Sequence, residues 1–196
     1  MDLIETGAVA QAVLPVAGLR AHLRMGSGFS DDTTQDDMLA AYLRAAIATI
    51  EARTGKALLR RGFELRLRAW AASERQPLPC APIATIDEIS LIGRDGAAMV
   101  VDAARWRLVA DMHRPLLVPV GAVLPVIPWG GGVRIRFEAG FGAEWGDLPT
   151  DLAQAVMLLA ARHYEDRDAG AAPGALPQAV AALCARWRAV RIGGGI

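Results

Sequence analysis

Histidine and cysteine are the residue types in this chain best suited to metal binding or nucleophilic chemistry. His22, His113 and His163 are far apart in the sequence, and none lies in an HExxH or HxH pattern that would hold a metal ion. Cys80 and Cys184 are also distant from each other, and neither belongs to a CxxC pair. The spacing therefore predicts packed or surface histidines, reduced cysteines and no metal centre.

Closely spaced carboxylates occur between Ser30 and Asp37, and such a stretch could form a calcium-binding loop. It lacks the DxDxDG spacing and the distal glutamate of such a loop, and helical periodicity begins at once. Hydroxyl and carboxylate groups ahead of a helix accept hydrogen bonds from its free backbone N–H groups and favour its positive end. We therefore expect this stretch to cap a helix.

Phosphate-binding and nucleophile motifs are also missing from the sequence, which has no Walker loop, no GxSxG elbow and no glycine-rich dinucleotide turn. Gly130, Gly131 and Gly132 precede a predicted strand, whereas a phosphate cradle needs a helix. The carboxylate pairs Asp36–Asp37 and Glu165–Asp166 are predicted at helix ends, where solvent reaches them. The sequence thus predicts a protein that is not an enzyme and binds no cofactor.

Charge is balanced over the chain, because 21 lysines and arginines face 21 aspartates and glutamates. Without a net positive field, DNA binding needs a local group of cations. Glu64 and Glu138 share one side of two predicted strands with the arginines of those strands, so this face could contact DNA or another subunit, or simply be solvated. The arginines concerned are Arg66, Arg68, Arg134 and Arg136.

The first part of the chain is predicted to be helical after an N-terminal arm. Residues 1–15 mix small and apolar residues, and residues 16–24 form a short amphipathic helix. A long helix follows from about residue 35 to residue 54, because apolar residues recur at helical spacing, and Gly55 supplies a left-handed cap. The buried stripe of the long helix comprises Leu39, Leu43, Ile47 and Ile50.

The apolar period changes from helical to two between residues 56 and 142, which marks a strand-rich module. Alternation is strongest in residues 63–68 and 133–138. Turn residues separate the weaker strands, and together the strands predict a small antiparallel sheet. These weaker strands are expected at residues 86–92, 98–101, 106–109 and 116–118.

Helical periodicity returns after Pro149, Thr150 and Asp151, which form a helix start signal. The helix that follows is expected to pack against the long helix. A last helix opens at Leu176–Pro177 and carries Trp187 on its apolar face. The chain ends in three glycines and Ile196, and such a tail needs a partner to become ordered.

Together these segments predict an α+β fold: a four-helix core of a short helix, a long helix and two C-terminal helices, with an antiparallel β insertion between the second and third helices. We expect one domain with an insertion. Its parts are an N-terminal arm and helices (1–57), the β-rich insertion (58–142), the C-terminal helices of the core (143–191) and a tail (192–196).

Targeting and membrane signals are missing from the sequence. No apolar run reaches the roughly 18 residues that a membrane-spanning helix needs. Residues 1–5 lack the basic and apolar blocks of a secretory signal. We therefore expect a soluble protein that is made in the cytoplasm and does not act at a membrane.

The order of these elements, together with four sequence stretches, resembles the head-tail adaptor, or head-tail connector, proteins of long-tailed phages and gene transfer agents. Each stretch is a packing or capping pattern, and their order with a strand-rich insert between the second and third helices is the more specific feature. The four stretches are residues 14–24, 36–58, 133–142 and 148–167.

The resemblance implies a structural subunit in the neck of a phage or phage-like particle. Twelve copies would form a ring beneath the portal protein, and DNA would pass through it without sequence specificity. A tail-completion or stopper protein would attach on the far side. The resemblance also implies that the C-terminal segment docks on the portal, although ordinary core packing is an equally good interpretation of its tryptophan. The docking residues would be Trp187, Arg188, Arg191, Ile192 and Ile196.

Other functions fit the same sequence. A DNA-binding module would use the arginine-bearing face of the sheet and bind DNA in a strongly salt-dependent manner. Another neck or tail-completion protein of the same kind of particle is a second alternative, although the helix order with inserted strands favours the adaptor. A small hydrolase with an unrecognised site is the third, and no motif supports it.

Overall fold

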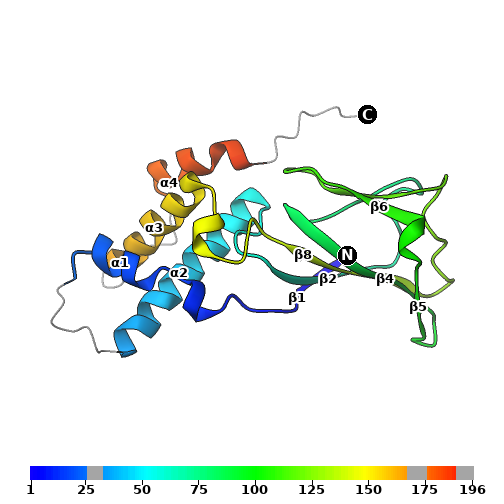
Figure 1. The fold of residues 1–196 in the computed structure, drawn as a ribbon, viewed down its shortest axis with the longest axis horizontal. Helices are drawn as coiled ribbons and strands as arrows, with labels where there is room; N and C mark the ends of the chain where they lie inside the picture. The colour runs from blue at the N-terminus through cyan, green and yellow to red at the C-terminus, as the bar shows by residue number, and fades with distance from the viewer. Residues whose placement is uncertain (26–32, 167–175, 189–196) are drawn as a thin grey trace. The chain divides into compact units, whose positions relative to one another are not determined.

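A computed structural model describes residues 1–25, 33–166 and 176–188 (Figure 1). Contacts within the chain divide it into two compact units. The first, here called the β unit, comprises Met1–Ala8 and Gly55–Ala143. The second, the helical unit, comprises Val9–Thr54 and Glu144–Ile196. Each unit is therefore assembled from segments that are distant in the sequence.

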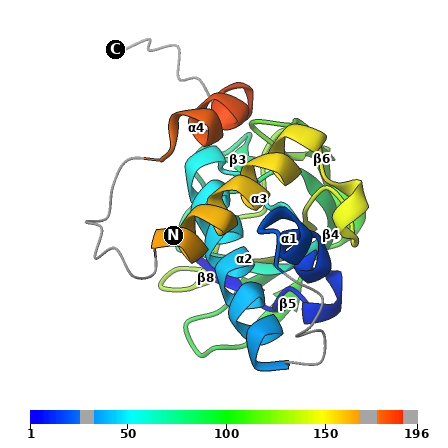
Figure 2. The same ribbon diagram turned by 90° about the vertical axis from the view of Figure 1, so that its left-hand side faces the viewer.

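Within the described residues, the helical unit contains four α-helices. They are α1 (Val16–His22), α2 (Thr33–Thr54), α3 (Thr150–Glu165) and α4 (Gln178–Cys184). Short 3-10 turns at Gln11–Val13, Trp145–Asp147 and Ala185–Trp187 complete the unit. Helix α2 packs against α3, and α1 and α4 pack against this pair (Figure 2).

Apolar stripes explain why α2 and α3 pack together. Leu39, Leu43 and Ile50 of α2 are fully buried, as are Leu152 and Val156 of α3. Removing such side chains from water is the main favourable contribution to folding. The stripe of α2, and the packing of the later helix against it, were predicted from the sequence. Among the described residues, no helix combines the length and the apolar character required to cross a membrane.

Two carboxylates near the start of α2 fasten the preceding segments to it. Asp36 forms an ion pair with Arg20 of α1, and Asp37 accepts a hydrogen bond from Gln11 Nε2 at 2.9 Å. An acidic group in the first turn also interacts favourably with the helix dipole. The earlier part of the predicted capping stretch lies within residues 26–32, outside the described residues.

Two antiparallel sheets form the β unit. The five-stranded sheet has the order β1–β2–β8–β4–β5, and the three-stranded sheet has the order β3–β7–β6. The strands are β1 (Asp2–Glu5), β2 (Arg61–Leu67), β3 (Gln76–Pro77), β4 (Ile83–Ile92), β5 (Ala98–Val100), β6 (Trp106–Val109), β7 (Leu116–Pro119) and β8 (Gly132–Ala139).

Strand β8 is the central strand of the larger sheet. Its Ile135 lies opposite Leu65 of β2 and Ile89 of β4, and all three side chains are buried. Phe137 stacks on Phe63 with ring centroids 5.6 Å apart. Leu117 of β7 belongs to the same apolar cluster. The three-stranded sheet therefore covers the apolar face of the five-stranded sheet.

The structure confirms the predicted α+β class and the antiparallel pairing, but the strands form two sheets where one was predicted. It also contains two strands that the sequence analysis missed. Strand β1 lies in the predicted N-terminal arm, and three of its four residues are exposed. Its own residues show no alternation, so its pairing with β2 decides its conformation. Strand β3 is two residues long and includes Pro77. Neither segment is long enough to show a period.

The close approach of Gly140 to the backbone of Arg60 is a packing constraint that can be tested. Gly140 has a φ of +137°, and an added Cβ would lie 2.4 Å from the backbone N and Cα atoms of Arg60. We expect Gly140→Ala to lower the free energy of unfolding by about 3 kcal/mol or more, because strained backbone and a steric clash add together. Urea denaturation followed by circular dichroism measures this difference.

Gly146→Ala is the matched control, because an added Cβ at Gly146 would meet no atom within 4 Å. Its unfolding free energy should stay within about 0.5 kcal/mol of the wild-type value. Equal unfolding midpoints for the two variants would show that the junction after β8 tolerates a side chain.

Candidate functional site

The arginines predicted in the strands lie on the face of the five-stranded sheet that is opposite the apolar core. Arg134 of β8 is in register with Arg66 of β2. Arg136 of β8 lies between Glu64 of β2 and Glu88 of β4. The structure thus brings these three arginines together on one face, as alternation predicts, but it also places carboxylates between them.

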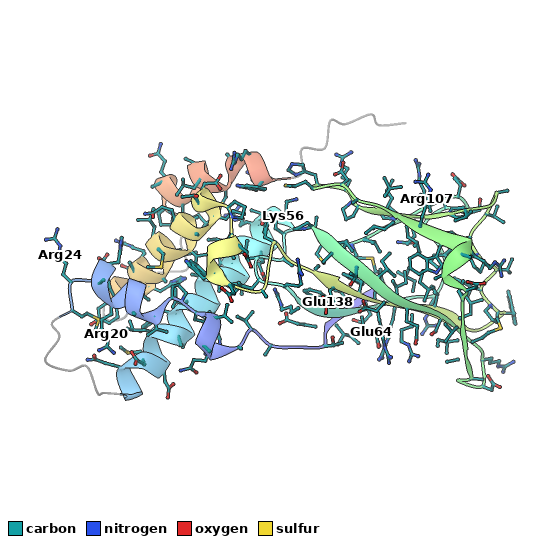
Figure 3. The ribbon with its side chains drawn as sticks, in the orientation of Figure 1. Arg20, Arg24, Lys56, Glu64, Arg107 and Glu138 are labelled. Atoms are coloured by element: carbon teal, nitrogen blue, oxygen red, sulfur yellow. The ribbon has the colours of Figure 1, made fainter. Side chains whose placement is uncertain are left out.

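Glu64 is the charged group around which this face is organised (Figure 3). Its side chain is 8% exposed and accepts hydrogen bonds from Arg66 Nε at 2.7 Å and Arg136 Nε at 3.2 Å. Burial acts to raise the pKa of Glu64, but the hydrogen bonds from Arg66 and Arg136 and the nearby positive charges outweigh it and hold the pKa below its ordinary value. One buried carboxylate therefore offsets part of the charge of two arginines.

Arg134 has a carboxylate partner of its own. Its Nη2 lies 3.7 Å from Glu88 Oε1, and the Ser90 hydroxyl donates a hydrogen bond to the same carboxylate at 2.5 Å. Each of the three arginines on the strands is therefore paired with an acidic side chain. A DNA phosphate at this face would have to compete with these carboxylates, which weakens binding by charge neutralisation.

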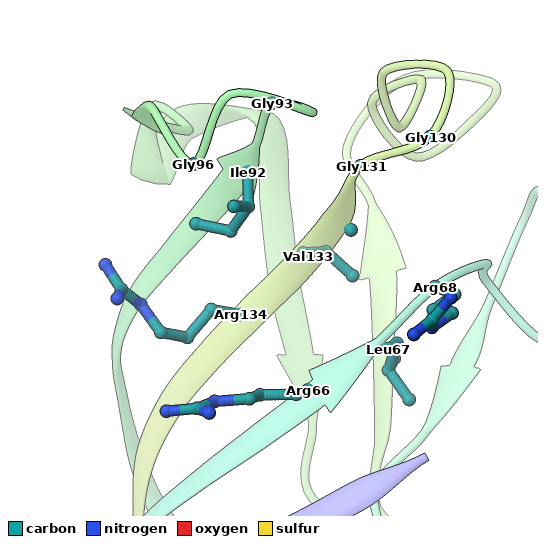
Figure 4. Close-up of a pocket in the computed structure, with 11 residues that line it drawn as sticks. Arg66, Leu67, Arg68, Ile92, Gly93, Gly96, Gly130, Gly131, Val133 and Arg134 are labelled. Carbon is teal, nitrogen blue, oxygen red and sulfur yellow. The ribbon is translucent and has the colours of Figure 1, made fainter.

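Three arginines also line a cavity of about 410 Å³ at the end of the sheet (Figure 4). Arg66 and Arg134 extend from neighbouring strands, and the exposed Arg68 lies beyond the end of β2. Four glycines from two turns, together with Gly132 at the start of β8, form much of the remaining wall. Arg136 does not line this cavity. The arrangement suits an anionic or polar group on a partner, and it unites three of the four predicted arginines.

Trp187 is anchored inside the helical unit. Its side chain is 8% exposed, and its Nε1 donates a hydrogen bond to Asp151 Oδ2 at 2.7 Å. Arg186 Nε donates to the same oxygen at 2.6 Å, and its guanidinium lies over the indole ring. Burial acts to raise the pKa of Asp151, but these donors outweigh it and hold the pKa below its ordinary value. The indole thus has the buried environment of a core residue.

The structure describes only one of the other residues that were predicted to dock on a portal. Arg188 is exposed at the end of the described helical segment. Arg191, Ile192 and Ile196 lie outside the described residues. Docking by this segment therefore stays a prediction.

Lys56, the single lysine of the chain, is a buried group that the sequence analysis did not identify (Figure 3). It is 2% exposed, and its Nζ lies 3.3 Å from His113 Nδ1. Burial lowers the pKa of Lys56, and the negative charge of Asp111 opposes this shift. Asp111 also accepts hydrogen bonds from the backbone N–H groups of His113 and Arg114. Lys56 thus contributes to fixing the loop between β6 and β7.

The described residues contain no cluster of three or more histidine, cysteine and acidic side chains that could hold a metal ion. Neither Cys80 nor Cys184 forms a disulfide in the part of the chain that the structure describes. Cys184 is buried, and burial together with the charge of Asp151 raises the pKa of its thiol. Cys80 is partly exposed. A raised pKa disfavours the reactive thiolate, so Cys184 suits packing better than nucleophilic chemistry.

A second surface feature lies in the loop between β7 and β8, which the sequence analysis treated only as turn material. Trp129 is 93% exposed and Val126 is 84% exposed. A groove of about 620 Å³ with a mostly apolar lining lies beside them. The sequence carries one signal for this surface: residues 120–131 contain no charged side chain.

The contact between Trp187 and Asp151 gives a prediction for stability. We expect Asp151→Ala to lower the free energy of unfolding by about 1–3 kcal/mol, because a buried indole N–H would lose its acceptor. Arg186→Ala, which removes the 69%-exposed partner of the same carboxylate, should cost less than about 1 kcal/mol. Urea unfolding of both variants provides the comparison. A larger loss in Arg186→Ala would contradict the assigned importance of the indole contact.

The pKa of Glu64 predicts how stability depends on pH. Its carboxyl binds a proton less readily in the folded than in the unfolded state, so its contribution is fully present above the unfolded value of about 4.5 and is lost as pH falls through the lower folded pKa. Glu64→Gln should therefore destabilise the protein by about 1–2 kcal/mol at pH 7 and much less near pH 3.

Chemical denaturation at both pH values measures this difference, and Glu138→Gln on the same face is the control. The control should change stability less than Glu64→Gln at pH 7. If Glu64→Gln costs the same at both pH values, charge pairing is not what stabilises this face.

Comparison with known proteins places the chain in a family. A scan of protein-family models and a search of curated proteins both found no match. Solved structures, by contrast, match along the whole chain. A chain in the neck of an empty GTA particle, computed with C6 symmetry, is 55% identical with a TM-score of 0.91. A chain in the neck of a native GTA particle, computed with C12 symmetry, is 52% identical with a TM-score of 0.85.

A third match, in the virion of a native gene transfer agent (GTA) particle, is 55% identical with a TM-score of 0.88. Each of the three comparisons covers 100% of this chain and 99% of the other. The matched helices and strands therefore include both units and every surface described above. Identity of this level over the full length of both chains shows that the protein belongs to the family of neck proteins of gene transfer agent particles.

Proposed function

We propose that this protein is a head-to-tail adaptor, which forms a ring beneath the portal in the neck of a phage-like particle. The observation that carries this proposal is its full-length similarity to neck proteins of gene transfer agent particles, two of which come from reconstructions with C6 and C12 symmetry. Such symmetry indicates a ring of identical copies. The sequence resemblance to head-tail adaptors supplies the position beneath the portal and the number of twelve.

The role is structural rather than catalytic. The protein would be made in the bacterial cytoplasm and would act in the particle, where its ring continues the channel for DNA and offers an attachment surface to a tail-completion or stopper protein. DNA must slide through such a channel, so the wall should not neutralise many phosphates at once. A net charge of zero, with the sheet arginines paired to carboxylates, is compatible with this requirement.

The C-terminal segment is the part assigned to portal docking. Trp187 has a structural role at the base of this segment, because it fixes the last turn to α3 through Asp151. The residues that follow it would supply the contact itself, with Arg188 and Arg191 as donors and Ile192 and Ile196 as apolar anchors. The C-terminal segment thus keeps its predicted docking role, while Trp187 holds the base of that segment in place.

The main alternative is a DNA-binding module that uses Arg66, Arg68, Arg134 and Arg136. The cavity lined by three of these arginines is the observation that favours it. The carboxylate partners Glu64 and Glu88 count against it, because they already neutralise the same guanidinium groups. Another neck or tail-completion protein of the same particle is the second alternative, and it shares the same relatives.

Electron microscopy of the protein with its cognate portal tests the adaptor assignment. We expect negative-stain images of the full chain to show a ring added to one end of the portal, with twelvefold symmetry in class averages. A chain truncated after Trp187 should fold, because the contact with Asp151 is retained, but should add no ring. Circular dichroism of the truncated chain controls for its folding.

The outcomes separate the two parts of the proposal. A ring formed by both chains would remove the docking role of the C-terminal segment and keep the adaptor role. If neither chain associates with the portal, the adaptor assignment fails. Salt-dependent retardation of duplex DNA by the full chain, lost in Arg66→Ala and Arg134→Ala, would then favour the DNA-binding alternative.

A further inference from the structure

The loop between β7 and β8 presents apolar side chains at regular intervals. Residues 120–131 carry no charge, and the exposed apolar residues are spaced three apart. Their exposed fractions are 61% for Val120, 54% for Val123, 84% for Val126 and 93% for Trp129. Isolated exposed apolar residues are ordinary on protein surfaces, but three of these four side chains line one groove, and such a shared apolar surface indicates an interaction site.

This loop is held in place by its own anchors. Leu124 is 3% exposed, and its N–H donates a hydrogen bond to Ser73 O at 2.7 Å. Trp70 Nε1 donates to Pro125 O at 2.8 Å. At the end of the loop, Gly131 lies so close to the Ile92 carbonyl that an added Cβ would come within 2.0 Å of its oxygen. The exposed side chains therefore cannot turn inward without breaking these contacts.

The loop also forms one wall of the 620 Å³ groove, whose other wall is supplied by residues 68–73 after β2. Trp70, Leu124 and Ile127 contribute apolar side chains to its lining, and Arg68 contributes a charged one. An exposed tryptophan beside a preformed apolar groove has the composition of an interface hot spot, where a large aromatic side chain becomes buried on association. The partner must therefore offer an apolar protein surface.

In a ring of identical copies, the neighbouring copy is such a partner, and it must offer a surface other than the loop itself. In a closed ring each copy uses two different surfaces, one for each neighbour. Strand β5 provides a second apolar element in the same unit, at the edge of the sheet, because Met99 and Val100 on its two faces are 61% and 63% exposed. Among the described residues, β5 pairs only with β4. In the sheet order, β8 and β4 separate β5 from β2, and β5 supplies no residue to the lining of the groove, so the groove and the β5 edge are separate surfaces.

We propose that Trp129 and Val126 of one copy pack against the β5 edge of the next copy in the ring. This inference rests on the proposed ring, and it assigns the lateral contact between subunits. Duplex DNA is a poor occupant of the loop, because phosphate recognition needs cations or donors and residues 120–131 have no charged side chain. The fixed conformation of the loop lowers the entropic cost of the contact.

Photocrosslinking in assembled portal complexes identifies the occupant directly. Trp129→p-benzoylphenylalanine in the full chain, irradiated after ring assembly, should give a product of twice the chain mass. Mass spectrometry should map the linked peptide to residues 98–102. The same photoreactive residue at Met112, an apolar side chain that is 47% exposed on another loop, is the control and should give no such product.

A link to a second copy outside β5 would overturn the assigned accepting surface. A link to the portal, to another neck protein or to DNA, or the absence of any link in complete rings, would overturn the lateral contact itself. If the unmodified wild-type chain forms no ring on the portal, the proposed function fails instead, so the two failures are distinguishable.

Assembly of a truncating variant gives an independent measurement. Trp129→Ala should need at least about tenfold more protein than wild type to complete rings on the portal, because hot-spot truncations weaken association by this amount or more. Its urea midpoint should stay unchanged, since the side chain is 93% exposed in the single chain. Met112→Ala should assemble like wild type. Equal assembly of Trp129→Ala and wild type contradicts the proposal.

Discussion

The alternation of side chains along β8 is the constraint on which the β unit depends. Val133, Ile135 and Phe137 face the apolar core, while Arg134 and Arg136 occupy the opposite face. Because β8 pairs with β2 and β4, a shift of one residue in its register would move its arginines into the core and Phe137 into water. The stacked ring pair and the ion pairs with neighbouring strands reinforce the same register from the two faces. Correct pairing of this one strand therefore determines both the core and the charged surface.

The charged face shows how carboxylates on neighbouring strands offset part of the charge of several arginines. Glu64 is buried next to two guanidinium groups, and a buried carboxylate is tolerated only when hydrogen bonds and opposite charges replace its lost hydration. Those same contacts use the Nε donors of Arg66 and Arg136 and offset part of their charge, so a phosphate would compete with Glu64 for these guanidinium groups. Arg68 differs, because it lies after the end of β2 and lines both the arginine-lined cavity and the apolar groove.

Helices and strands whose own apolar residues recur at helical or alternating spacing were predictable from the sequence. Elements whose conformation depends on pairing with a distant segment were not. The long helix α2 and strand β8 each carry enough regularly spaced apolar residues to identify themselves, and the predicted helical stripe is buried. Strand β1 exists through its pairing with β2, which lies far away in the sequence. The position of Trp187 in the helical pattern is the same whether its side chain packs inside the helical unit or docks on a portal. The hydrogen bond to Asp151 is what identifies the packed role. Leu124 and Trp129 are both apolar and lie in the same loop, yet Leu124 is buried and Trp129 is exposed. Their residue types therefore could not show which of the two faces water.

An apolar surface that is exposed before assembly must avoid association with the wrong partner, and the loop before β8 contains a feature that limits this risk. Pro125 and Pro128 have no backbone N–H, so the loop cannot add as a regular strand to the edge of another sheet. Association through unpaired strand edges is the common route by which exposed apolar segments aggregate. A partner of this loop must instead match the shape of Trp129 and Val126. Such selectivity matters in a ring of identical copies, because a contact accepted at several places would produce open chains, whereas a contact accepted at one place allows the ring to close.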